Sequence, residues 1–150
     1  MQRRQTGFTL IELAIVTVVI GILASLIIVG FQKVQQRARD DTRLTQATAL
    51  NSALKHYFDE HGEYPAPAAC SGGSNAVCSA AQDLTPLLVP AYIQAIPDQP
   101  NGAPYQYMRG TESGSYGILV QYETMWQCKT GRNMDPSWWG GNSWAPDCPF

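Results

Sequence analysis

Residues 8–31 read FTLIELAIVTVVIGILASLIIVGF, a predominantly apolar run in which Glu12 is the single charged side chain. About 20 apolar residues, each rising 1.5 Å in a helix, span the hydrocarbon core of a bilayer. A cleavable secretory signal has a shorter apolar core of about 7 to 15 residues before its cleavage point, and Ala24-Ser25 offers only a poor site of that kind. The run therefore predicts a retained hydrophobic helix that anchors the chain in a membrane.

The rest of the chain is polar and of ordinary size for one domain. The sequence has 150 residues, enough for a single head with a sizeable core. Its 10 basic and 12 acidic side chains give a net charge of −2, and charged residues make up only 15% of the chain, below the usual quarter. A basic surface that binds nucleic acid is therefore not expected.

All four cysteines follow the apolar run, at Cys70, Cys78, Cys128 and Cys148. An even number of cysteines in such a segment is typical of disulfides, which form in oxidising compartments. Basic residues lie on both sides of the apolar run, so the positive-inside rule does not fix its orientation. The cysteines instead predict a single-pass protein whose C-terminal part lies outside the cytoplasm.

Glu12 is the unusual residue of the apolar run. A carboxylate in hydrocarbon costs on the order of 2 to 4 kcal/mol near the midplane and less toward an interface, so a partner is expected. The alternative is that Glu12, close to the start of the run, extends to the lipid headgroups and has no further role.

The stretch Gly7-Phe8-Thr9-Leu10-Ile11-Glu12 follows a short basic leader and opens the apolar run. It resembles the prepilin signature shared by type IV pilins and type II secretion pseudopilins. The resemblance implies that a prepilin peptidase cuts between Gly7 and Phe8 and methylates the new N-terminus at Phe8. It also implies that Glu12 guides each subunit into a growing filament.

Elementary electrostatics agrees with this assignment. Cleavage after Gly7 would place a cationic α-amino group at the start of an apolar helix, where it requires an anion. Glu12 of a neighbouring subunit would supply that anion. Because the amine and the carboxylate of one chain are four residues apart, about 6 Å of helical rise, such a pair joins subunits that are offset along the filament axis.

The helix is expected to continue beyond the membrane. Residues 32–61 contain neither proline nor glycine, and Gly62 marks the stop. Apolar residues at spacings of three and four define one face that should pack on the head: Leu44, Ala47, Leu50, Leu54, Tyr57 and Phe58. A short helical turn is predicted at residues 84–90, and strands are predicted at residues 105–108, 116–122 and 124–128.

These elements predict an α+β protein with a pilin-like fold, in which a long N-terminal α-helix packs on a small antiparallel β-sheet with a disulfide-bonded C-terminal loop. The expected divisions are a leader peptide at residues 1–7, a transmembrane or filament-core helix at residues 8–31, and a globular head at residues 32–150. The head includes the C-terminal half of the helix.

Four cysteines allow three pairings. Their spacing favours Cys70 with Cys78 and Cys128 with Cys148, because each pair closes a loop in which no regular structure is predicted. The second pair also resembles the C-terminal disulfide loop of type IV pilins. A zinc site is disfavoured, because the spacings lack the C-x₂₋₄-C ligand pairs that such sites use.

Asp98 and Asn101 are candidate calcium ligands, because the comparable turn often helps to bind calcium in the major pseudopilins that the chain resembles. Two donors fall short of the six to eight oxygens that calcium takes, and the alternative is an Asx-type turn before a strand. His56 and His61 are five residues apart and face different sides of a helix, unlike a zinc-binding HExxH pair. We predict no cofactor and no enzymatic activity, since the sequence has no nucleophile or phosphate-loop motif.

Trp138, Trp139 and Trp144 lie in a tail rich in glycine, serine and asparagine. They either pack across the disulfide loop or form an exposed aromatic surface for ligand, surface or subunit contacts. The sequence leaves both alternatives open.

The first expectation for function is a structural one: a type IV pilin-like subunit, cut after Gly7 and polymerised through its helix into an extracellular pilus. The cysteines favour this hypothesis over the alternative, a type II secretion pseudopilin that forms a periplasmic filament and acts in protein export. A membrane-tethered enzyme or binding module would not need Gly7, Phe8 and Glu12 in this arrangement. The expected partners are identical or related subunits, the prepilin peptidase, the inner-membrane assembly machinery and, before assembly, the bacterial inner membrane.

Overall fold

The computed structural model describes residues 7, 9–66, 77–112, 114–124, 126–141 and 144–148. The chain divides into two compact units, Met1–Gln36 and Arg37–Phe150. One long helix, α1 (Leu10–His61), contributes residues to both units. The predicted continuation of the apolar helix to residue 61 is therefore confirmed.

The first unit contains the part of α1 that ends at Gln36 and the residues before the helix. Among the described residues, α1 is the one helix long and apolar enough to cross a membrane, and none of its most apolar stretch is buried within the chain. Leucine, isoleucine, valine and phenylalanine side chains are exposed from Leu10 to Val34. This surface has no covering element within the first unit.

In the second unit, α1 buries the face that its periodicity predicts. Ala47, Leu50 and Leu54 are fully buried in the core of the head. The helix ends at His61, and Gly62 follows with a positive φ of 73°. The N–H of Gly62 donates to the Phe58 carbonyl at 2.8 Å, so a glycine in the left-handed region closes the last turn.

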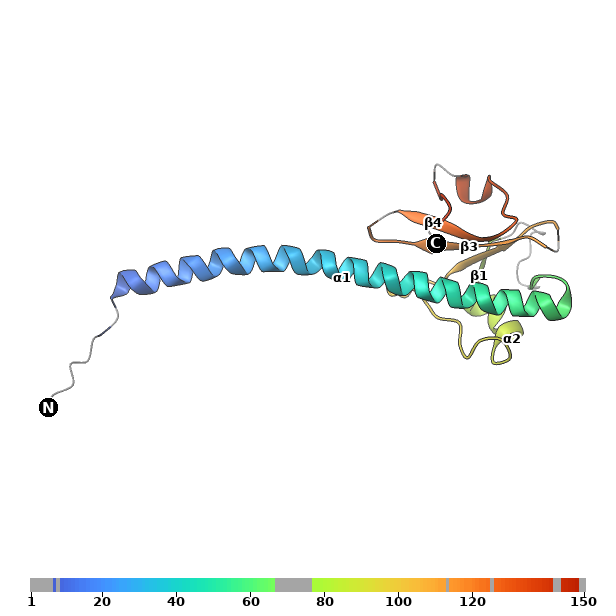
Figure 1. Ribbon diagram of the computed structural model, residues 1–150, viewed down its shortest axis with the longest axis horizontal. Coiled ribbons are helices and arrows are strands. Elements are labelled where there is room, and N and C mark those ends of the chain that lie inside the picture. The colour runs from blue at the N-terminus through green and yellow to red at the C-terminus, as the bar shows by residue number, and fades with distance from the viewer. Residues whose placement is uncertain are drawn as a thin grey trace. The chain divides into compact units, whose positions relative to one another are not determined.

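Four strands form one antiparallel sheet in the order β1-β2-β3-β4, beside the C-terminal part of α1 (Figure 1). They are β1 (Val77–Ser79), β2 (Gln106–Arg109), β3 (Tyr116–Gln121) and β4 (Gln127–Arg132). Tyr107, Ile118 and Val120 are buried in one core with the α1 face. Asn51 of α1 accepts a hydrogen bond from the Tyr116 hydroxyl and donates one to the Thr130 hydroxyl, which ties the helix to β3 and β4.

Between β1 and β2 the chain forms a π-helical turn, Ala80–Leu84, and a short helix, α2 (Thr85–Leu88). Leu84 and Leu88 are fully buried and complete the core. The helical turn predicted at residues 84–90 is therefore present.

The chain after β4 folds over the sheet face opposite α1 (Figure 1). Gly117 alternates along β3 with the core residue Ile118, and a Cβ on Gly117 would lie 2.9 to 3.1 Å from the rings of Trp138 and Trp139. The absence of a side chain at Gly117 thus makes room for the two indoles. The head is built as three layers: helix, sheet and C-terminal segment.

The C-terminal disulfide joins Cys128 of β4 to Cys148, with their Cα atoms 4.9 Å apart. The Lys129 N–H donates to the Pro146 carbonyl, and the Cys148 N–H donates to the Lys129 carbonyl, each at 2.9 Å. These bonds place the last described residues parallel to β4. The predicted pairing of Cys128 with Cys148 is confirmed, but the prediction that its loop lacks regular structure was wrong.

Two predictions about the sheet also need correction. Three strands were expected, whereas β1 adds a fourth that contains Cys78; three residues are too few for a period of two to be visible. The third predicted strand, at residues 124–128, begins only at Gln127. Thr124 does not extend the strand, because its N–H and hydroxyl bind the carboxylate of Asp40.

Candidate functional site

The start of α1 is organised around Glu12. The N–H and the hydroxyl of Thr9 both donate to Oε2 of Glu12, at 2.9 and 2.7 Å, and the Glu12 N–H donates to the Thr9 hydroxyl at 3.3 Å. This reciprocal pattern is a capping box, which satisfies N–H groups that the first helical turn leaves unpaired. Glu12 is exposed, and no residue in the described part of the chain donates to its Oε1. One carboxylate oxygen therefore remains available to a second molecule.

Gly7 lies before the helix, is exposed and has no neighbouring atom where its Cβ would be. Phe8, the residue expected to carry the methyl group, lies outside the described residues. Cleavage between Gly7 and Phe8 and methylation of Phe8 stay predictions.

The surface that follows Glu12 along α1 is apolar on all sides. Exposed fractions of the large apolar side chains range from 70% at Ile27 to 48% at Val19, and Phe31 is 60% exposed. A contiguous apolar surface of this extent marks a contact with lipid or with other protein. What the N-terminal unit offers is thus a binding surface with one carboxylate at its start.

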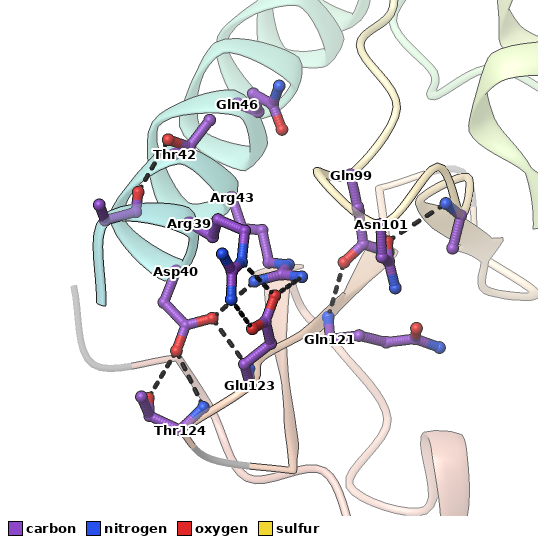
Figure 2. Close-up of polar contacts among 12 residues, drawn as sticks. Arg39, Asp40, Thr42, Arg43, Gln46, Gln99, Asn101, Gln121, Glu123 and Thr124 are labelled. Carbon is purple, nitrogen blue, oxygen red and sulfur yellow. Dashed lines mark hydrogen bonds and ion pairs between the residues drawn. The ribbon is translucent and has the colours of Figure 1, made fainter. Parts of the chain in front are cut away.

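A second polar cluster lies in the head, where α1 meets the connection between β3 and β4 (Figure 2). The Arg43 guanidinium is 1% exposed and donates to Asp40 Oδ1 and Glu123 Oε1, at 2.8 Å each. Arg39 also pairs with the Glu123 carboxylate, through its Nε at 2.8 Å and its Nη2. Glu123 therefore bridges two arginines that lie one helical turn apart.

The side chain of Asp40 binds the backbone of the same connection. Its carboxylate accepts hydrogen bonds from the N–H groups of Glu123 and Thr124, at 2.9 and 3.0 Å, and from the Thr124 hydroxyl. Figure 2 shows both carboxylates between α1 and the strand connection. We call these five residues, Arg39, Asp40, Arg43, Glu123 and Thr124, the clamp.

The clamp shifts the pKa values of its two acids. Hydrogen bonds from Arg39 and then Arg43 lower the pKa of Glu123 to about 2. Burial acts to raise the pKa of Asp40, but the hydrogen bonds from Thr124 and from the backbone, together with the charge of Arg43, outweigh burial and lower it. Both acids are therefore ionised at neutral pH, and the clamp is held by charged hydrogen bonds.

Hydrogen bonds of Asn101 and Gln99 hold the turn that contains the calcium candidates. The Asn101 side-chain oxygen accepts the Ala103 N–H at 3.2 Å, as expected of an Asx turn. Gln99 is 2% exposed and accepts the Gln121 N–H at 3.1 Å, which ties the turn to the end of β3 (Figure 2). Asp98 is exposed. In the described part of the chain, no three His, Cys, Asp or Glu side chains gather where they could hold a metal ion.

The three tail tryptophans divide between the two alternatives. Trp138 is 5% exposed, and the Trp139 indole N–H donates to the Gln106 side-chain oxygen at 3.1 Å, so both pack on the sheet. Trp144 is 60% exposed. Cys78 takes part in a disulfide, while Cys70 lies outside the described residues, so the pairing of Cys70 with Cys78 stays a prediction.

The clamp was not predicted from the sequence. Asp40 and Arg43 have the spacing of an ion pair on one helix face, which was a usable signal. Glu123, however, lies 80 residues from Arg43 along the chain, and no local pattern links residues at such a distance. The exposed Trp126, next to the clamp in the β3–β4 connection, was also missed.

Two family models match the chain. The prokaryotic N-terminal methylation motif matches residues 2–28, and type II secretion system protein G matches residues 31–135. The type II secretion system core protein G of Aeromonas hydrophila is 31% identical over 121 residues, which are 79% of this chain and 82% of the relative. The protein of the same name from Escherichia coli strain K12 is 31% identical over 120 residues, 77% of this chain and 80% of the relative.

Pilins match over a shorter length. The type IV major pilin protein PilA of Myxococcus xanthus is 46% identical over 61 residues, which are 41% of this chain and 28% of the pilin. No solved structure matches the chain significantly.

The methylation-motif match includes Gly7, Phe8 and Glu12, so it supports the resemblance found in the sequence. The protein G match extends from α1 through all four strands of the sheet. Since this second match covers well over half of the 150 residues, the chain belongs to the type II secretion system protein G family.

Proposed function

We propose that this chain is a pseudopilin of a type II secretion system. It is made as a membrane-anchored precursor, cut after Gly7, methylated at Phe8 and polymerised through α1 into a periplasmic filament that acts in protein export. The family and its relatives are structural, so the chain is a pilus-like subunit and not an enzyme. The comparisons favour this function over the pilin that the cysteines had ranked first, because the pilin matches are partial.

The observation that carries the proposal is the uncovered apolar surface of α1. No part of its most apolar stretch is buried within the chain. Exposed leucine, isoleucine and valine side chains are unfavourable in water by about 25 cal/mol per Å² of apolar area. Lipid covers this surface in the precursor, and the same helix of neighbouring subunits covers it in the filament.

Glu12 has a defined place in this scheme. Its Oε2 caps the helix of its own chain through Thr9, while Oε1 is open to a donor from another molecule. We propose that the N-terminal amine of a neighbouring subunit binds there. The attraction between two opposite charges is stronger in apolar surroundings than in water. The contact therefore favours the axial register in which the amine meets Glu12 over other registers.

Processing is tested by mass spectrometry of the membrane fraction and of isolated filaments. We expect a mature protein that begins at Phe8 and carries one additional methyl group. A mature protein that begins at Met1, or one cut near Ser25, would contradict the proposal.

The role of Glu12 is tested with two substitutions that separate capping from charge. Glu12→Gln keeps an oxygen that accepts from Thr9, because glutamine also serves in a capping box, but it removes the negative charge. Glu12→Ala removes both. We expect normal membrane insertion and strongly reduced filament yield from both variants. Normal filament numbers from Glu12→Gln would mean that Glu12 acts only as a helix cap.

The choice between pseudopilin and pilin is tested by deleting the chain in its own bacterium. If the chain is a pseudopilin, we expect the deletion to make secreted proteins accumulate in the periplasm while surface pili remain. Loss of surface pili with normal secretion would support the pilin instead.

A further inference from the structure

Trp126 is the most exposed large apolar side chain described in the head. It is 82% exposed, whereas Trp138 on the same head is 5% exposed. We propose that Trp126 is a docking residue for assembly, which inserts against the apolar surface of α1, residues 10–34, of a second copy of this chain. This inference rests on the proposed filament, since it names a contact within it.

The backbone of Trp126 is held in place by its neighbours. Gln121 and Gln127 pair across the strands on either side of the connection, and the Tyr122 N–H donates to the Trp126 carbonyl at 3.3 Å. Glu123 and Thr124, in the same connection, are bound to α1 by the clamp. An aromatic residue on a fixed backbone loses little conformational freedom when it binds, which favours affinity.

The clamp holds a short connection at a large desolvation cost. Arg43 is almost completely withdrawn from water, and the desolvation of an ion pair offsets much of its Coulomb energy. What the arrangement achieves is the fixed presentation of an indole that buries little of its own surface in the head. A buried indole removes on the order of 150 to 250 Å² from water, so the side chain has most of this area left to bury against a partner.

A second copy offers the matching chemistry. Apart from Val77, Leu87, Trp126 and Trp144, every exposed large apolar side chain in the described chain lies between residues 10 and 34 of α1. The clamp binds the connection to α1 at Asp40, which follows Val34 by only six residues on that helix. A contact of Trp126 with α1 of a neighbouring subunit would thus add a contact between head and helix to the proposed contacts between the apolar helices.

The inference is tested first by photo-cross-linking in the full chain. Benzoylphenylalanine replaces Trp126 in one variant and Trp144, which is 60% exposed on the same head, in the matched control. In cells that assemble filaments, we expect the label at position 126 to form dimers of the chain, with the cross-linked peptide inside residues 10–34. The label at position 144 should give no cross-link to that segment.

The second test compares filament yield for Trp126→Ala, Trp126→Phe and the control Trp144→Ala. Loss of an aromatic anchor at the centre of an interface weakens binding by more than tenfold, so we expect at least a tenfold lower yield for Trp126→Ala. Trp126→Phe should retain most assembly, and Trp144→Ala should resemble the wild type. Formation of the Cys128–Cys148 disulfide, read by peptide mapping, verifies that each head is folded.

The outcomes separate this inference from the proposed function. Absence of filaments from the wild type would contradict the proposed function itself. If wild-type filaments form and Trp126→Ala assembles equally well, the docking role of Trp126 is wrong. Cross-links from position 126 that reach only lipid, only another protein, or only parts of the chain outside residues 10–34 would also overturn it.

Discussion

Replacement of Arg43 by leucine should destabilise the head strongly. The side chain is 1% exposed and joins Asp40 of α1 to Glu123 of the β3–β4 connection. Arg43→Leu keeps an apolar side chain in the site but removes the cation. Asp40, which is 5% exposed, would then be a buried carboxylate without its arginine.

The expected magnitude follows from the contacts that survive. Removal of one partner from a buried ion pair costs about 3 to 5 kcal/mol. Here Asp40 keeps three hydrogen bonds from Glu123 and Thr124, and Glu123 keeps its pair with Arg39. Because these contacts remain, we expect the free energy of unfolding to fall by about 3 kcal/mol, the lower end of that range.

Urea unfolding of the full chain in detergent micelles, followed by tryptophan fluorescence, measures this loss. Arg109→Leu is the matched control, because Arg109 pairs with Glu63, whose side chain is 56% exposed. An exposed pair contributes at most about 1 kcal/mol. A double-mutant cycle with Asp40→Asn and Arg43→Leu should give a total loss that is smaller than the sum of the two single losses by at least about 0.5 kcal/mol.

Two results would refute this reasoning. If Arg43→Leu costs no more than Arg109→Leu, the buried charges of the clamp do not stabilise the head. If the losses from Asp40→Asn and Arg43→Leu simply add, the two residues do not act as one unit.

Three further predictions concern the same head. Cys128→Ser should lower the free energy of unfolding by about 3 kcal/mol, the chain-entropy value for a disulfide between residues 20 apart, and should shift tryptophan emission to the red. The folded state lowers the pKa of Glu123 to about 2 and also lowers the pKa of Asp40. The stability that these two acids contribute should therefore be fully present above the usual carboxyl pKa range and should be lost as the pH falls from about 4.5 toward 2. Acid titration followed by circular dichroism measures this loss. Gly131→Ala should destabilise the head by at least 1 to 3 kcal/mol, because its Cβ would lie 2.1 Å from a backbone oxygen, whereas Gly114→Ala meets nothing within 4 Å and serves as the control in thermal unfolding.

Local patterns were sufficient to predict the helix and its buried face. Ala47, Leu50 and Leu54 recur at helical spacing, and all three are fully buried. Their period is set by the 3.6 residues per turn of the helix, so no tertiary information is needed to recognise it. The stop at Gly62 was equally local, since the left-handed conformation that ends the helix favours glycine.

Features that depend on distant residues were not predictable in the same way. The strand β1 has only three residues and exists because β2 supplies its hydrogen-bond partners. The burial of Trp138 depends on Gly117, whose missing side chain leaves space on the sheet. The clamp needs Glu123 and Arg43 to meet across 80 residues. In each case the deciding partner lies outside any local window of sequence.

The cysteines ranked the pilin above the pseudopilin, whereas the comparisons favour the pseudopilin, and this difference has a physical reason. A disulfide such as Cys128–Cys148 reports that a segment folds in an oxidising compartment. The periplasm meets that condition as well as the cell exterior does, so the bond is compatible with a pseudopilin and with a pilin. The Gly7 to Glu12 motif does not separate them either, because both groups share it. The distinction has to come from the head, and it is the head that the protein G model covers.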